Sequence, residues 1–166
     1  MKIAGKQKFL GQIAALPRAM KDEIRKALEV SADETTDLMK RFVPVRSGAL
    51  RASIGFTFGE YTPDNASVRG LQSTGTGATE LTVTMHAGDA KAWYAGLVEF
   101  GTRKHMILPR EPGGKLRLNG GRFVDEVEHP GSDASPFFLP AYRFGKKRAR
   151  SRLARAVRNG ARKAMK

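Results

Sequence analysis

The chain has 166 residues, contains no cysteine and carries a formal net charge of +14 at pH 7. This length accommodates one domain, or one domain with a helical arm, and the lack of thiols excludes disulfides, thiolate metal sites and cysteine nucleophiles. Apolar residues make up 40% of the chain, which excludes extensive disorder, yet no stretch approaches the roughly 20 apolar residues of a membrane span, so we expect a soluble protein without a membrane partner.

The first predicted element is a long helix over residues 17–43. Pro17 suits the first turn of a helix, where its missing N–H costs nothing. Apolar and small residues then recur at spacings of three and four, which draws one apolar stripe along the helix. Val43 precedes Pro44, and a residue before proline disfavours the helical conformation, so the helix ends there. The stripe comprises Met20, Ile24, Ala27, Leu28, Ser31, Thr35, Leu38 and Phe42.

A small, mostly antiparallel sheet is predicted within residues 50–130. Ser47-Gly48 marks a turn, after which apolar residues alternate with small or polar ones over residues 54–58. The clearest strand pattern lies at residues 81–87. His86 falls on the polar side of that pattern, which predicts that it faces solvent.

Two segments outside these elements carry weaker signals. Residues 61–79 are rich in Gly, Ser, Thr, Asn and Pro, which predicts a long surface loop or exposed hairpin, with a short strand around 68–71. A helical turn or two is expected before the long helix, around Phe9, Ile13 and Leu16.

A short helix is predicted between strands, over residues 92–100. Trp93, Leu97 and Phe100 share one face at positions i, i+4 and i+7, and Gly101 stands where a helix commonly ends. Tyr94 lies beside that face. These apolar side chains therefore provide bulk for a core or for an interface.

The residue pattern of the rest of the chain predicts a hairpin and a C-terminal helix. Residues 102–136 are rich in Gly and Pro, and Asn119-Gly120-Gly121 would join arms near 116–118 and 122–127. The predicted class is α+β: a long N-terminal helix packed on a small sheet, a short helix between strands and a basic C-terminal helix. We place a single domain at residues 1–142 and a basic helical extension at 143–166.

The residue patterns do not predict a catalytic, cofactor or metal site. No two histidines stand at helical ligand spacing, and there is no G-x-S-x-G elbow and no Walker lysine. Asp125 and His129 would lie on the strand face opposite Glu126 and Glu128. A hydrolase site around Glu99, Asp125 and His129 is a remote alternative, because a lone carboxylate beside aromatic residues usually caps or pairs locally. We expect a protein that is not an enzyme.

The positive charge is concentrated at the C-terminus. Residues 143–166 contain eleven Lys and Arg residues and no acid, so the remaining residues carry only +3. This segment either binds phosphate backbones without sequence specificity or presents a helix face that is solvated or paired with an acidic partner protein. The residues expected to contact DNA or a partner are Lys146, Lys147, Arg148, Arg150, Arg152, Arg155, Arg158, Arg162 and Lys163.

Three ordered motifs carry a family resemblance. Residues 43–54 (VPVRSGALRASI) are close to VP-x-[RK]-[ST]-G-x-L-[RK]-x-S-I, and residues 93–102 (WYAGLVEFGT) are close to YA-xx-VE-[FY]-GT. The third motif, HPG at 129–131 followed by PFFLPA at 136–141, is close to HPG…PF-xx-PA. Together they resemble the phage tail-component family that includes minor tail protein Z and the neck proteins of long-tailed phages and related prophages. The motif residues are Pro44, Arg46, Gly48, Leu50, Tyr94, Glu99, Phe100, Gly101, Thr102, Pro136, Phe137 and Pro140.

This resemblance implies a structural protein of the virion neck or head–tail junction, which completes the tail or joins it to the DNA-filled head. It implies assembly in the bacterial host cytoplasm as a homo-oligomer around the tail axis. The implied partners are other neck and tail proteins: a head-closure or stopper protein, the tail terminator and the tail tube. Contact with DNA is open, and the main alternative is a nonspecific nucleic-acid-binding protein that acts through its basic C-terminal helix.

Overall fold

The protein has the predicted α+β class. A computed structural model describes residues 16–62, 79–111 and 113–164. The helical turn expected around Phe9 and Ile13, and the strand expected at 68–71, lie outside these residues. The elements are α2 (Arg18–Phe42), α3 (Ala49–Ala52), β1 (Gly55–Phe58), β2 (Val83–His86), α4 (Ala95–Phe100), β3 (His105–Ile107), β4 (Leu116–Arg117), β5 (Phe123–Val124), β6 (Val127–His129) and α5 (Phe138–Ala164).

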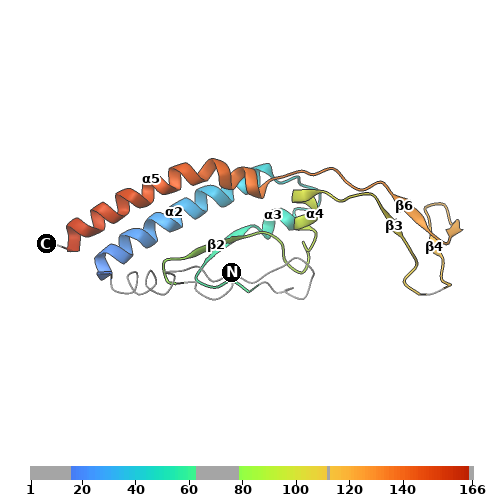
Figure 1. Cartoon of the computed structure of the whole chain (residues 1–166), viewed down its shortest axis with the longest axis horizontal. Coiled ribbons are helices and arrows are strands. Elements are labelled where there is room, and N and C mark those ends of the chain that lie inside the picture. The colour runs from blue at the N-terminus through green and yellow to red at the C-terminus, as the bar shows by residue number, and fades with distance from the viewer. Residues whose placement is uncertain (1–15, 63–78, 112, 165–166) are drawn as a thin grey trace, which may run out of the picture.

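Helices α2 and α5 form a long antiparallel pair (Figure 1). The limits of α2 confirm the predicted helix to within one residue at each end. The two helices approach closely because glycines of α5 face α2. A Cβ atom built on Gly145 would lie 2.6 Å from the hydroxyl oxygen of Thr35, and one built on Gly160 would lie 2.7 Å from the Cα of Met20. Larger side chains at these two positions would push the helices apart.

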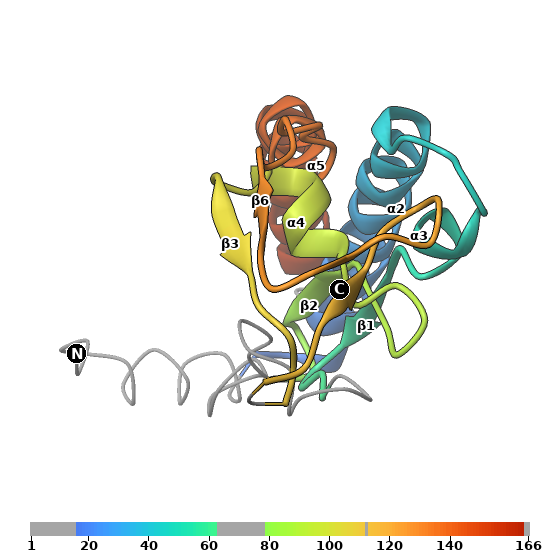
Figure 2. The same ribbon diagram turned by 90° about the vertical axis from the view of Figure 1, so that its right-hand side faces the viewer.

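A second side of α2 packs against the antiparallel strands β1 and β2. Their register pairs Gly55 with His86 and Phe58 with Val83, which confirms the two strands expected from alternation. Figure 2, in which the right-hand side of Figure 1 faces the viewer, shows α2 and α5 side by side above these strands. The buried core lies where α2, α3, α4 and the start of α5 meet, and consists of Met39, Val43, Leu50, Ile54, Ala92, Ala95, Phe137 and Ala141.

An extended arm between α4 and α5 projects beyond the helices and carries the other four strands (Figure 1). Strand β3 pairs with β6, and β4 pairs with β5. The inner pair β4–β5 confirms the predicted hairpin around Gly120. At the root of the arm, Thr102 and Ser132 form an antiparallel bridge. The arm therefore leaves the body and returns to it at the same place.

The structure corrects the expectation that His86 faces solvent. Its ring is half-buried and stacks on Tyr61 with 4.0 Å between ring centroids, and its Nε2 lies 3.2 Å from the hydroxyl of Thr57. Burial lowers the pKa of His86 below its ordinary value. The C-terminal helix begins at Phe138 and runs without a break through residue 142. The division of the chain at that residue stays a prediction.

Candidate functional site

Glu99 joins the second and third motifs. Its side chain is 6% exposed. The carboxylate oxygen Oε2 accepts hydrogen bonds from the backbone N–H groups of Phe137 and Phe138, both at 2.8 Å, and Oε1 accepts one from Leu139 at 2.9 Å. These donors belong to the first turn of α5, where a helix has no internal acceptors and carries partial positive charge. Glu99 therefore caps α5 from a neighbouring helix.

The first motif contributes apolar residues to the core at the place where α4 meets the start of α5. Leu50 is buried beside Phe137 in the core, and Gly48, at φ 80°, forms the turn before α3. Pro44 and Arg46, by contrast, are exposed. The three motifs thus build one rigid junction whose outward-facing members are free to contact another molecule.

The root of the arm contains the remaining motif residues. Gly101 ends α4, and Thr102 bonds Ser132 through both its backbone and its hydroxyl group. Pro136 is exposed and Pro140 is half-buried in the first turn of α5. Proline fits position 140, since the first turn of a helix makes no internal use of its N–H groups, while Pro136 precedes the helix, which begins at Phe138.

Helix α4, which begins at Ala95 and not at residue 92 as predicted, and the turn before it present much of their apolar surface to solvent. Trp93 is 55%, Leu97 43% and Phe100 71% exposed. Tyr94 and Val98, in contrast, pack against the core. The sequence left open whether these apolar residues serve the core or an interface. In the structure, Tyr94 and Val98 contribute to the core, while Trp93, Leu97 and Phe100 form an exposed apolar surface.

A surface hollow of about 560 Å³ lies between the first and second motifs. The residues that line it include Pro44, Arg46, Gly48, Leu50, Tyr94 and Val98. Beyond it, the arm exposes further large apolar residues, namely Met106, Ile107, Leu108 and Phe123. Apolar side chains are thus available both at the junction and along the arm.

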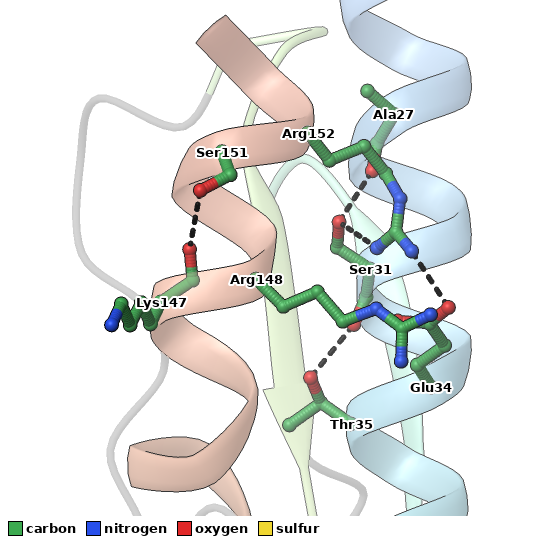
Figure 3. A network of polar contacts seen from close by, with 8 residues as sticks. All are labelled: Ala27, Ser31, Glu34, Thr35, Lys147, Arg148, Ser151 and Arg152. Atoms are coloured by element: carbon green, nitrogen blue, oxygen red, sulfur yellow. Dashed lines mark hydrogen bonds and ion pairs between the residues drawn. The ribbon is translucent and has the colours of Figure 1, made fainter. Parts of the chain in front are cut away.

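The cations of α5 do not share one environment. Arg152 is mostly buried, and its guanidinium donates to the hydroxyl of Ser31 at 2.9 Å and to the carboxylate of Glu34 at 2.6 Å (Figure 3). Arg148 lies 3.6 Å from the same carboxylate, and Lys163 pairs with Glu23 at 2.6 Å. These three predicted contact residues attach α5 to α2. Within residues 16–62, 79–111 and 113–164, the exposed candidates without such a pair are Lys146, Lys147, Arg150, Arg155, Arg158 and Arg162.

Acid should loosen the attachment of α5 to α2. The hydrogen bond from Arg152 lowers the pKa of Glu34 below its ordinary value of 4.5. The stability from this pair is complete above that value and is lost as pH falls through the lower folded pKa. Because the Glu34 side chain is 40% exposed, solvent screens the pair and we expect a loss of at most about 1 kcal/mol.

Thermal unfolding followed by circular dichroism at a series of pH values measures this contribution. Glu34→Gln should flatten the decrease in stability between neutral and acid pH. Glu126→Gln, at an exposed position of the arm, serves as the matched control and should leave the profile unchanged. Equal profiles for both variants would contradict the assignment.

The residues considered for catalysis do not converge. Asp125 lies 4.0 Å from Lys115, and Glu128 pairs with Lys104, both within the arm. In the described part of the chain, no group of three or more His, Asp or Glu side chains is placed to hold a metal ion. Among the same residues, no helix combines the length and apolarity needed to cross a membrane.

Comparison with known proteins identifies the family of the chain. No curated protein and no solved structure is significantly similar to the chain. Residues 7–101 match the family described as "Bacteriophage HK97-gp10, putative tail-component". The matched region contains α2, the strands β1 and β2, the first motif and all but the last residue of the second, and it ends just after α4, which supplies the cap of α5. The chain belongs to the HK97-gp10 family of bacteriophage tail components.

Proposed function

We propose that this protein is a non-enzymatic structural subunit of the phage neck, where it completes the tail or joins it to the DNA-filled head. The carrying observation is the exposed apolar surface formed by Trp93, in the turn before α4, and by Leu97 and Phe100 of α4. Large apolar side chains that cluster on a surface mark contacts with other proteins, and aromatic residues often dominate the binding energy.

The projecting arm supports the same proposal. An isolated two-stranded ribbon is marginally stable in water, and this arm also exposes Met106, Leu108 and Phe123. A neighbouring protein that covers the arm would remove this apolar surface from water and stabilise the ribbon. The proposed neighbours are further copies of this chain and the stopper, terminator and tube proteins.

The arm and the α4 surface occupy different parts of the protomer. A contact between the arm of one copy and the body of the next would be head-to-tail, and such contacts form a ring when the rotation between copies closes and a filament when it does not. A ring around the tail axis is the oligomer that we propose. The rival function, nonspecific nucleic-acid binding through α5 alone, leaves both apolar surfaces without a role.

The double variant Trp93→Ala/Phe100→Ala tests the assembly surface. Both side chains are more than half exposed, so the fold should change in stability by no more than about 1 kcal/mol. Loss of two aromatic anchors should weaken association by roughly 700-fold, since such residues contribute about 2 kcal/mol each and every 1.4 kcal/mol is tenfold. Sedimentation equilibrium measures self-association, and complementation of a phage that lacks the protein measures incorporation into particles.

Val30→Ala/Val157→Ala provides the matched control, because these valines are also exposed but lie on α2 and α5. It should leave association and incorporation unchanged. Imaging of the virion neck then gives the position and copy number directly. A wild-type protein that is stably monomeric and absent from purified virions would overturn the proposal.

A further inference from the structure

The cations of α5 fall into two sets with different surroundings. Arg148, Arg152 and Lys163 pair with acids of α2, as described above. The cations that have no carboxylate partner in the described chain are Arg143, Lys146, Lys147, Arg150, Arg155, Arg158 and Arg162. The attachment of α5 to α2 therefore accounts for three cations, and more than half of the positive charge of α5 has no role in that attachment.

Four of the unpaired cations lie on the side of α5 that faces away from α2. Residues that contact α2, such as Gly145, Arg152 and Gly160, mark the inner side. At 3.6 residues per turn, Arg143, Lys147, Arg150 and Arg158 come to the opposite side. We call these four residues the outer cationic lane. They extend over roughly 22 Å of helix, at 1.5 Å per residue.

The charges at the start of the lane repel one another. Arg143, Lys146, Lys147 and Arg150 line a surface hollow of about 310 Å³ together with Ser151. They stand at i, i+3, i+4 and i+7, spacings at which like charges destabilise a helix. A bound polyanion would remove this repulsion. Among the described residues, no carboxylate pairs with these four side chains to compensate for it.

The chemistry of the lane favours nucleic acid over an acidic protein. Protein interfaces usually have an apolar centre. On the side of α5 that carries the lane, the position between Arg150 and Arg158 is occupied by Ala154, which has only a small side chain. The nearest aromatic residues, Tyr142 and Phe144, are not members of the lane: Tyr142 lies beneath Lys146, 5.9 Å from its Nζ, and Phe144 packs edge-on against Phe42 of α2. Because the lane itself contains no aromatic ring to stack on bases, it fits the backbone of a duplex better than single-stranded DNA.

We propose that the outer cationic lane of α5 binds the phosphate backbone of duplex DNA without sequence specificity. A duplex carries one negative charge per roughly 1.7 Å of axis, so several phosphates come within reach of the lane. The rigid pairing of α5 with α2 holds the cations in a row. This contact goes beyond the proposed assembly role and does not depend on it.

The triple variant Arg143→Gln/Lys147→Gln/Arg150→Gln tests the lane. Fluorescence anisotropy with a short labelled duplex gives the slope of log affinity against log salt. Each lost phosphate contact lowers the magnitude of that slope by about 0.9, so the variant should lose about 2.7. Between about 50 and 200 mM salt, wild-type affinity should therefore fall about 40-fold more than that of the variant.

A control variant, Arg18→Gln/Lys26→Gln/Arg41→Gln, removes the same charge from exposed positions of α2. It should keep nearly the full wild-type slope. The proposal is wrong if the two triple variants have equal slopes, if single-stranded DNA binds more tightly than duplex, or if the wild type binds an acidic protein and not duplex. Self-association of the same variants reports on the assembly role separately, and the lane variant should assemble normally.

Discussion

Glu99→Ala should lower the free energy of unfolding by about 3 kcal/mol or more. The change removes three charge-assisted hydrogen bonds to the backbone N–H groups of Phe137, Phe138 and Leu139. Because Phe137 is 1% exposed, water cannot readily replace the lost acceptor there. The effect is a large share of the roughly 5–15 kcal/mol that stabilises a typical domain.

Urea unfolding followed by far-ultraviolet circular dichroism measures this loss. Glu99→Gln retains an acceptor but not the charge, so its effect should be intermediate. Glu126→Gln again serves as an exposed control and should stay within about 0.5 kcal/mol of wild type. Equal stability of Glu99→Ala and the control would show that the cap does not hold α5 in place.

Gly101→Ala should destabilise the protein by a comparable amount. Gly101 adopts φ 68° and ψ −175°, a conformation that is essentially restricted to glycine and costs other residues about 1–3 kcal/mol. An added Cβ would also lie 2.6 Å from the carbonyl oxygen of Ser132 and 2.9 Å from the backbone nitrogen of Ala134. Because both neighbours are backbone atoms, relief of the contact requires the root of the arm to move.

Two other glycines separate these contributions. Gly59 has φ 81° but no atom within 4 Å of an added Cβ, so Gly59→Ala should show only a conformational cost of about 1–2 kcal/mol. Gly96 lies in α4 with open space around it, so Gly96→Ala should stabilise the helix slightly. Thermal unfolding should rank Gly101→Ala as least stable, then Gly59→Ala, then Gly96→Ala. A different order would contradict the role of the contact with Ser132.

Local patterns were sufficient for the elements whose neighbours lie close in the sequence. The limits of α2 followed from its periodicity and from Pro44, and the strands β1 and β2 followed from alternation. Strands β3 and β6 were not foreseen. They have three residues each and lie in a Gly- and Pro-rich region, where so short a run gives no usable period.

The junction could be predicted only in part. The pattern placed Trp93, Leu97 and Phe100 on one face, but periodicity cannot tell a face that meets its own core from one that meets another chain. The buried acid of that helix was Glu99, whose partners begin 38 residues later in the sequence. Its capping role depends on how α4 and α5 meet, which no local pattern encodes.

The pairing of α5 with α2 was hidden for a similar reason. Arg152 and Glu34 are separated by 118 residues, and each is one of many charges on its helix. The close approach depends on Gly145 and Gly160, which add little to an apolar stripe. One signal was available: Ser31 and Thr35 stand on the stripe of α2 where larger apolar residues would be usual, which is compatible with a neighbouring helix close by.

The root of the arm has a consequence for how this protein can vary. Thr102 and Ser132 are paired, Ser135 donates its backbone N–H to Val98 at 2.8 Å, and Glu99 holds the next helix. The arm therefore starts and finishes at one closed point of the body. Doubling the length of a flexible loop costs only about 0.6 kcal/mol. Insertions or deletions beyond this root can change how far the protein reaches, while the packed core keeps its stability.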